Sequence, residues 1–181
     1  ADIKTIAMLG GYAMTAITAA TAQNTVGVQA ITPLSGSFVA QQIASCITDI
    51  GVDAVKIGML HDADIIAHVA TALKMLPPEV PVVLDPVMIA TSGDPLIAPD
   101  AIAALEARLF PRATVLTPNL PELEHMTGRR LPDSGLMEDA AADLARRHGV
   151  HVLAKGGHTD DAQVIDLLVS PDGKALLYRH A

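Results

Sequence analysis

The sequence predicts an α/β fold built on a mainly parallel central sheet, with an antiparallel hairpin at one edge. From about residue 54 onward, short apolar strands alternate with amphipathic helical stretches, which is typical of βαβ units. Near the C-terminus two apolar runs flank Pro171, Asp172 and Gly173, a strong turn signal that predicts the hairpin. We find no internal repeat or linker and expect a single domain over residues 1–181.

Six helices are predicted from helical periodicity and from the residues that begin or end helices. They cover 1–9, 37–49, 62–76, 99–109, 120–127 and 135–148. Ser37 is expected to cap the second helix, whose inner face would carry Val39, Ile43, Cys46, Ile47 and Ile50. Glycines follow the first, fifth and sixth helices, because glycine readily takes the left-handed conformation found there. The third ends at Pro77, since proline cannot continue a helix.

Strands are predicted where short apolar runs lie between turn residues. They cover 14–22, 28–32, 54–58, 82–84, 113–116, 152–154, 164–169 and 175–178. The run over 14–22 is small, apolar and rich in threonine, so we expect it to be buried. The last two strands form the predicted hairpin.

Composition restricts the classes of function. The formal net charge of −8 disfavours a nucleic-acid partner, because phosphate backbones are bound by clustered cationic residues. The single cysteine, Cys46, excludes an internal disulfide and favours a cytoplasmic setting, and its apolar helical surroundings predict a packed thiol. No apolar run is long enough to span a membrane, so no membrane partner is expected.

Three polar motifs stand where predicted strands end. They are DPVM at 85–88, TPNLPE at 117–122 and KGGH at 155–158. The carboxyl ends of parallel strands lie along one edge of a sheet, where ligands bind. Carboxylates hold hard cations through oxygen, whereas lysine and glycine-rich backbone amides receive phosphate oxygens. The three motifs therefore predict a site for a metal-bound nucleotide.

The common nucleotide and hydrolase motifs are absent from the sequence. It contains no G-x-x-x-x-G-K-[ST] loop, no G-x-G-x-x-G, no H-E-x-x-H and no G-x-S-x-G. Phosphate chemistry would therefore use another scaffold.

Each polar residue also has a structural interpretation. Asn119 and Glu122 are spaced as a helix N-cap and its capping-box partner, and from spacing alone the cap is favoured over a metal site. Asp85 before proline fits a turn, and Lys155 fits a solvated side chain in a tight glycine turn. His158 and the other six histidines are interpreted as structural or surface residues. Lys56, within a predicted strand, must reach solvent or a carboxylate partner.

Six blocks in order along the chain resemble the hydroxymethylpyrimidine/phosphomethylpyrimidine kinase family of the ribokinase superfamily. They are AQNTVGV at 22–28, KIGML at 56–60, DPVM at 85–88, SGDPL at 92–96, TPNLPE at 117–122 and KGGH at 155–158. Each block is weak alone, but together they cover nearly the whole chain and are specific. The resemblance implies a ribokinase-like three-layer α/β/α fold and ATP- and Mg²⁺-dependent phosphorylation of a pyrimidine alcohol and its monophosphate.

The resemblance also implies roles for individual residues. Gln23 would hydrogen-bond the pyrimidine, and Asp2, Met59 and Val87 would line the same pocket. A second set would serve the nucleotide and the metal. It consists of Asp85 and Glu122 beside the metal and phosphates, Asn119 next to them, and Lys155 with Gly157 near the nucleotide phosphates.

The family also has a strand with a glycine-rich loop before the first of these blocks, and an anion hole with the presumed catalytic base after the last. We expect both segments to lie outside these 181 residues. The catalytic base is expected C-terminal to Ala181, so no residue of this sequence is assigned that role.

Two other functions stay open. One is a pyridoxal or pyridoxine kinase of the same superfamily, and the other is a non-catalytic pyrimidine-binding module. Gln23 and Met59 favour the pyrimidine. A homodimer is expected by resemblance, with support from the mean hydropathy of +0.38.

Overall fold

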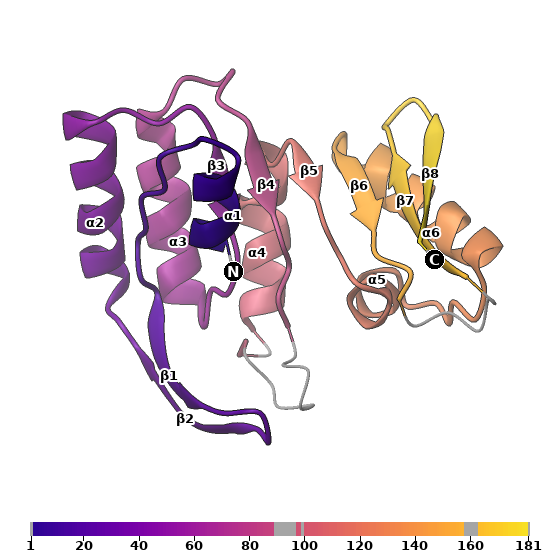
Figure 1. Cartoon of the computed structure of the whole chain (residues 1–181), viewed down its shortest axis with the longest axis horizontal. Helices are drawn as coiled ribbons and strands as arrows, with labels where there is room; N and C mark the ends of the chain where they lie inside the picture. The colour runs from indigo at the N-terminus through magenta and orange to yellow at the C-terminus, as the bar shows by residue number, and fades with distance from the viewer. Residues whose placement is uncertain (1, 89–96, 99, 158–162, 181) are drawn as a thin grey trace.

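The computed structural model describes residues 2–88, 97–98, 100–157 and 163–180 (Figure 1). Three features singled out in the sequence lie outside the described residues: block 92–96, His158 and Ala181. The strands in this part of the chain form one six-stranded sheet and a separate two-stranded hairpin.

The six-stranded sheet has the order β3-β4-β5-β6-β7-β8. Its strands are β3 Val55–Ile57, β4 Val82–Leu84, β5 Val115–Leu116, β6 His151–Ala154, β7 Val164–Val169 and β8 Ala175–His180. The first four are parallel, and the last two form an antiparallel hairpin at the edge. Both predictions, the mainly parallel sheet and the edge hairpin, are confirmed.

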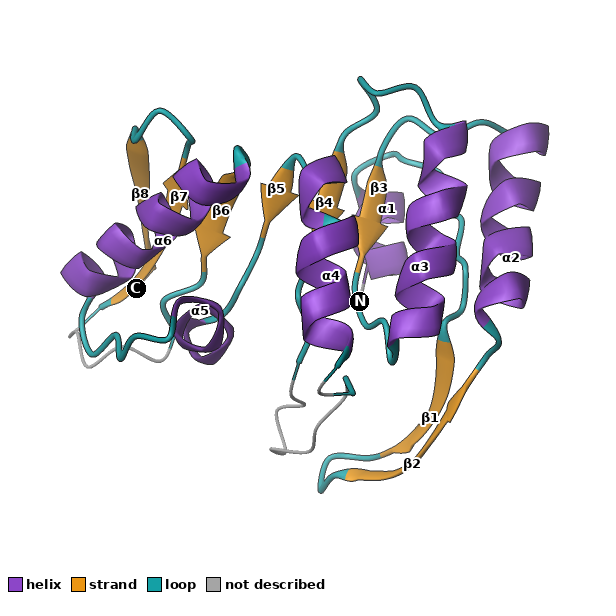
Figure 2. Cartoon of the chain, turned by 180° about the vertical axis from the view of Figure 1, so that it is seen from behind, coloured by secondary structure: helices purple, strands orange, loops and turns teal. Residues whose placement is uncertain are grey.

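Helices lie on both faces of the sheet. Neighbouring parallel strands follow one another in sequence, so right-handed crossovers place the connecting helices on one face. Figure 2 shows α3, α4 and α6 in front of the strands, with α1 behind them. The helices therefore lie on both faces, in the three-layer arrangement that the resemblance implied.

The helices agree with the predicted set to within a few residues at each end. They are α1 Asp2–Met8, α2 Gly36–Asp49, α3 Ala63–Ala72 with the 3₁₀ turn Leu73–Met75, α4 Ala101–Arg108 with the 3₁₀ turn Phe110–Arg112, α5 Leu120–Thr127 and α6 Ser134–His148. Gly128 and Gly149 take left-handed φ angles of 66° and 67° after α5 and α6, as predicted. None of the described helices is long and apolar enough to cross a bilayer.

The predicted N-cap of α2 was wrong by two residues. Ser35, not Ser37, has the extended conformation of a cap, and its side chain accepts the N–H of Phe38. Ser37 lies in the first turn, where its backbone is already helical. Ile50 was also misplaced on the inner face, because it follows the last helical residue and is exposed. Cys46 is only partly buried.

The N-terminal strands form a hairpin outside the main sheet. β1 Ala19–Gln23 pairs antiparallel with β2 Val28–Pro33. The prediction of a buried strand over 14–22 was wrong, since β1 is shorter and largely exposed. Alanine and threonine offer little apolar area to bury, and Figure 1 shows the hairpin extending past the edge at which β4 and β5 end.

One histidine departs from the predicted surface role. The His148 side chain is only 14% exposed, and its ring meets that of Phe110 edge to face at a centroid distance of 5.0 Å. Nε2 lies 3.1 Å from Oε1 of Glu106, without hydrogen-bond alignment. His148 ends α6, so helix packing decides its burial, which its spacing in the sequence could not indicate.

Candidate active site

Asp85 and Lys155 meet at the carboxyl edge of the main sheet. Asp85 follows β4, Lys155 follows β6, and β5 lies between these two strands. The Lys155 Nζ donates to Asp85 Oδ1 at 3.0 Å, and the side chains are 38% and 20% exposed. Backbone bonds hold both positions, since the Asp85 N–H donates to Ile57 O and the Lys155 N–H to Pro118 O. The prediction that these residues share one edge is confirmed.

Asn119 and Glu122 form a reciprocal capping box at the start of α5. The Asn119 side chain accepts the Glu122 N–H at 2.9 Å, and Glu122 Oε2 accepts the Asn119 N–H at 2.8 Å. The predicted cap is confirmed. Glu122 Oε1 also accepts the Met88 N–H at 3.4 Å, which joins α5 to the segment after β4. Both carboxylate oxygens are therefore engaged by backbone donors.

Glu122 is a buried carboxylate close to two other charges. The residue is only 4% exposed. Burial raises the pKa of Glu122 above the usual value, and the negative charge of Asp85 raises it further. The amide donors at Asn119 and Met88 and the positive charge of Lys155 oppose this rise in pKa. A cation near Glu122 would lower the cost of its buried charge.

This raised pKa predicts a pH-dependent contribution to folding. The folded protein holds the Glu122 proton more tightly than the unfolded chain does. Its contribution is complete below pH 4.5, the ordinary glutamate value, and is lost as pH rises through the folded pKa. The measured quantity is the difference in the free energy of unfolding between the wild type and Glu122→Gln. In metal-free buffer, we expect the wild type to lose stability relative to this variant as pH rises from 4.5 through the folded pKa. Urea unfolding at several pH values measures it, and a constant difference would contradict the assignment.

The glycines after Lys155 differ in how much space surrounds them. A Cβ on Gly156 would lie 1.9 Å from the carbonyl oxygen of Ile165 on β7, far inside contact distance. A Cβ on Gly157 would meet no atom of the described residues within 4 Å. Gly156 is thus required by a close approach of two backbones, whereas Gly157 leaves open space beside the turn.

We expect Gly156→Ala to lower the free energy of unfolding by about 2–3 kcal/mol or more, because β7 must move away from the new methyl group. Gly157→Ala is the matched control and should change it by no more than about 0.5 kcal/mol. Urea denaturation of both variants measures the difference. Equal stabilities would show that the turn relaxes without cost.

The predicted pyrimidine pocket is less complete in the described contacts. Asp2 accepts from Lys56 Nζ at 2.7 Å, so the predicted carboxylate partner of Lys56 is found, and this bond lowers the pKa of Asp2. The Met59 carbonyl accepts from Thr18 Oγ1 at 2.8 Å. Val87 follows Asp85 in the segment after β4, and Gln23 is exposed at the end of β1. The contacts described here do not join Gln23, Met59 and Val87 to one another.

The catalytic base was expected C-terminal to Ala181, and this expectation stays a prediction. The described residues end at His180, and Ala181 itself lies outside them.

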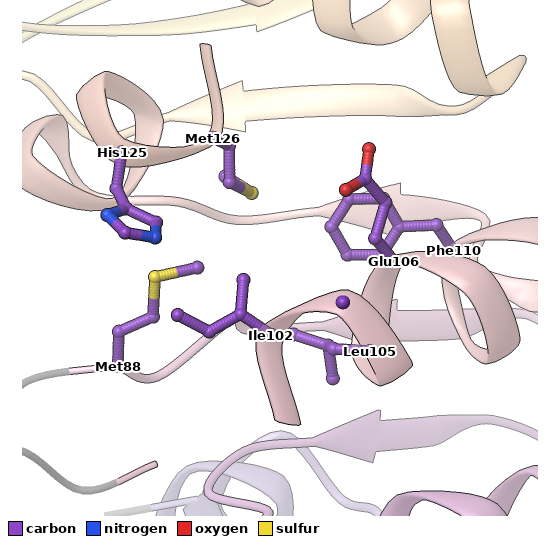
Figure 3. A pocket seen from close by; sticks show the side chains of 8 residues that line it. Met88, Ile102, Leu105, Glu106, Phe110, His125 and Met126 are labelled. Atoms are coloured by element: carbon purple, nitrogen blue, oxygen red, sulfur yellow. The ribbon is translucent and has the colours of Figure 1, made fainter. Parts of the chain in front are cut away.

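A separate pocket of about 370 Å³ lies between α4 and α5. It is lined mainly by apolar side chains, and Figure 3 shows Met88 and His125 pointing toward each other across it. Its lining includes none of the polar residues of the three motifs. Sequence reasoning missed this pocket, since Met88 and Met126 have the pattern of ordinary core residues.

Asp85 and Glu122 are the two carboxylates that could hold a metal ion at this site. In the part of the chain that the structure describes, no three or more His, Cys, Asp or Glu side chains are grouped to hold a metal. Asp85 and Glu122 nevertheless lie within electrostatic range of each other. Mg²⁺ commonly takes one or two protein carboxylates and fills its remaining positions with water and substrate phosphate. The two carboxylates fit a magnesium ion that a nucleotide completes.

Comparisons with known proteins show the family to which the chain belongs. A family model described as phosphomethylpyrimidine kinase matches residues 1–180. The chain is 43% identical over 176 residues to the hydroxymethylpyrimidine/phosphomethylpyrimidine kinase of Escherichia coli K12, covering 96% of this chain and 65% of that protein. It therefore spans slightly less than two thirds of that relative's length.

Two solved structures are similar to the whole described fold. One is the crystal structure of phosphomethylpyrimidine kinase from Clostridium difficile 630, with a TM-score of 0.87 and 38% identity over 98% of this chain and 76% of that one. The other is an ADP complex of Bacillus subtilis pyridoxal kinase, with a TM-score of 0.81 and 33% identity over 99% and 67% of the two chains.

Proposed function

The chain belongs to the phosphomethylpyrimidine kinase family, and from this premise we propose that it phosphorylates 4-amino-5-hydroxymethyl-2-methylpyrimidine and then its monophosphate in thiamine biosynthesis. ATP is the proposed phosphate donor. In the first step a bond forms between the hydroxymethyl oxygen and the γ-phosphorus, the bond from that phosphorus to the β–γ bridging oxygen breaks, and ADP leaves. We assign no described residue as the base that accepts the hydroxyl proton.

The observation that carries this proposal is the Asp85–Lys155 pair beside buried Glu122 at the strand ends. Phosphoryl transfer depends on positioning and on charge stabilisation more than on covalent chemistry, and this edge offers both. Lys155 Nζ would leave Asp85 for the nucleotide phosphates. Gly157 would offer its open backbone to a phosphate oxygen, and Asn119 would keep α5 in place beside them.

Asp85 and Glu122 would hold Mg²⁺ together with the nucleotide. When bound, the ion would offset negative charge on the phosphates. The Glu122 carboxylate is held at the start of α5 by two backbone donors, and the Asp85 carboxylate would become free for the ion once Lys155 turns to the phosphates. The structural role of Glu122 in the cap is compatible with this second role.

The pyrimidine would bind on the hairpin side of the same edge. Gln23 would recognise the ring through its amide, with Met59, Val87 and Asp2 around it. The exposed position of Gln23 on β1 is compatible with a residue that engages substrate as it arrives, and Asp2 is held toward Lys56 on β3.

Pyridoxal kinase is the second candidate, because the Bacillus subtilis pyridoxal kinase shares the fold at 33% identity. Steady-state kinetics of the full-length protein with both alcohols and Mg-ATP separates the two. We expect the higher kcat/KM for the pyrimidine, and a higher value for pyridoxal would overturn this substrate. Calorimetry that detects pyrimidine binding without any Mg-ATP binding would instead support the non-catalytic module.

The proposed enzyme is cytoplasmic and homodimeric. The lone cysteine fits a reducing compartment, and the exposed apolar side chains of α1 and β8 offer surface for a second subunit. These side chains include Ile3, Met8, Leu176 and Leu177. Light scattering of the full-length protein at micromolar concentration should return a dimer, and a monomer would contradict the second half of this proposal.

A further inference from the structure

Asp166 on β7 contacts the turn that carries Lys155. Its Oδ1 accepts the backbone N–H of Gly156 at 2.9 Å, and its Oδ2 lies 3.0 Å from Nε2 of His180 on β8. The Asp166 side chain is only 26% exposed, and each of its two oxygens has one of these partners. It therefore links the edge hairpin to the candidate phosphate site.

The turn is held from two directions. On one side the Lys155 N–H donates to the Pro118 carbonyl at 2.9 Å. On the other side Asp166 holds the next peptide through Gly156. Two successive N–H groups are thus bound to different neighbours, which fixes the orientation of the peptide planes on both sides of the Lys155 Cα. The direction in which the Lys155 side chain leaves the backbone follows from these planes.

The contact between Asp166 and Gly156 lies just beyond the regular pairing of β6 with β7. Their last ladder pair is Ala154 with Leu167. Two residues further along the chain, Gly156 approaches the Ile165 carbonyl so closely that no Cβ fits. The Gly156 N–H is satisfied by a carboxylate, and hydrogen bonds to a charged acceptor are shorter and stronger than neutral ones.

We propose that Asp166 is a positioning residue for the nucleotide phosphates: it holds the Gly156 peptide so that Lys155 points to the phosphate site and the Gly157 backbone stays open to it. This inference rests on the proposed function, because it assumes that Lys155 and Gly157 receive phosphate. Asp166 would act through the Gly156 peptide and would not contact the reacting atoms itself.

The alternative is that Asp166 only terminates the β6–β7 ladder and stabilises the hairpin. Asp172 provides a matched control for this alternative. It lies at the other end of the same hairpin, where its carboxylate pairs with Ser170 and Lys174, and these contacts lower its pKa to about 2. A purely structural carboxylate in this hairpin should affect stability alone.

The experiment compares Asp166→Ala, Asp166→Asn and Asp172→Ala in the full-length protein. The readouts are the KM for ATP, the KM for the pyrimidine, the Kd for Mg-ADP by calorimetry, and the melting temperature. We expect Asp166→Ala to raise the KM for ATP and the Kd for Mg-ADP by about 10-fold or more, with the pyrimidine KM changed less than about 2-fold. Asp166→Asn keeps an acceptor for the Gly156 N–H and should stay within about 3-fold of the wild type. Asp172→Ala should leave all three constants unchanged.

Should Asp166→Ala fail to fold, Asp166→Glu takes its place. It keeps the charge but displaces the carboxylate by one methylene, so it should weaken ATP and ADP binding in the same way. The proposal is overturned if the folded variants bind ATP and ADP as the wild type does, or if both substrates weaken equally.

The two proposals fail in different ways. A wild type that binds Mg-ADP but phosphorylates neither alcohol contradicts the proposed function, while calorimetry still decides the role of Asp166. A wild type that binds no nucleotide overturns both.

Discussion

Asp85→Asn is expected to lower kcat by roughly 10²-fold or more, with little change in stability. The substitution keeps the shape of the side chain but removes the charge that faces Lys155 and that would hold Mg²⁺. Removal of one electrostatic stabiliser of a transition state typically costs this much. The ion pair is partly exposed, so its loss should lower the free energy of unfolding by no more than about 1 kcal/mol.

Asp143→Asn is the matched control, because Asp143 also accepts from a cation, Arg147 on α6, in an exposed ion pair. It should leave kcat unchanged. Steady-state kinetics with saturating pyrimidine and a magnesium titration measures the effect. Near-normal turnover of Asp85→Asn at every magnesium concentration would contradict a role in catalysis. Asp85 would then have only the structural role of a turn residue before proline.

Glu122→Gln is expected to lower kcat by a similar factor, roughly 10²-fold, and also to weaken the fold. Glutamine can serve in a capping box, so the spacing alone would leave the cap intact in this variant. The structure alters that expectation, because both Glu122 oxygens accept backbone N–H groups. One oxygen would become an NH₂ donor facing another donor, which should lower the free energy of unfolding by about 1–3 kcal/mol.

Glu124→Gln separates the two effects. Glu124 lies on the same helix and accepts the Leu131 N–H at 2.7 Å, but it is not part of the strand-end cluster. The Glu124→Gln variant should have a lower free energy of unfolding and an unchanged kcat. If both variants lose turnover only in proportion to unfolding, Glu122 serves the cap alone.

The polar cluster could be predicted from the sequence because parallel strands place their carboxyl ends together. Asp85 and Lys155 are 70 residues apart, yet each directly follows a short apolar strand. The cap at Asn119 was equally accessible, since a capping box is a local pattern with a fixed spacing. The local sequence pattern and the order of the strands were therefore sufficient to predict where these residues lie.

Other features depend on contacts that no local pattern contains. β1 was predicted as buried because its residues are small and apolar, but nothing in its sequence shows that the hairpin leaves the sheet. In the sequence, Asp166 is simply a polar residue within the predicted strand over 164–169. Its contact with the Gly156 N–H depends on how closely the end of β6 approaches β7. The sequence shows two adjacent glycines but does not indicate which of them lies against the Ile165 carbonyl.

The most direct test of the central claim is a crystal structure of the full-length protein with Mg²⁺ and a non-hydrolysable ATP analogue. We predict that the terminal phosphates lie at the carboxyl edge of the sheet, with Lys155 moved from Asp85 to a phosphate oxygen and Mg²⁺ beside Asp85 and Glu122. Phosphates seated elsewhere, for example in the pocket between α4 and α5, with the Asp85–Lys155 pair intact, would contradict the account.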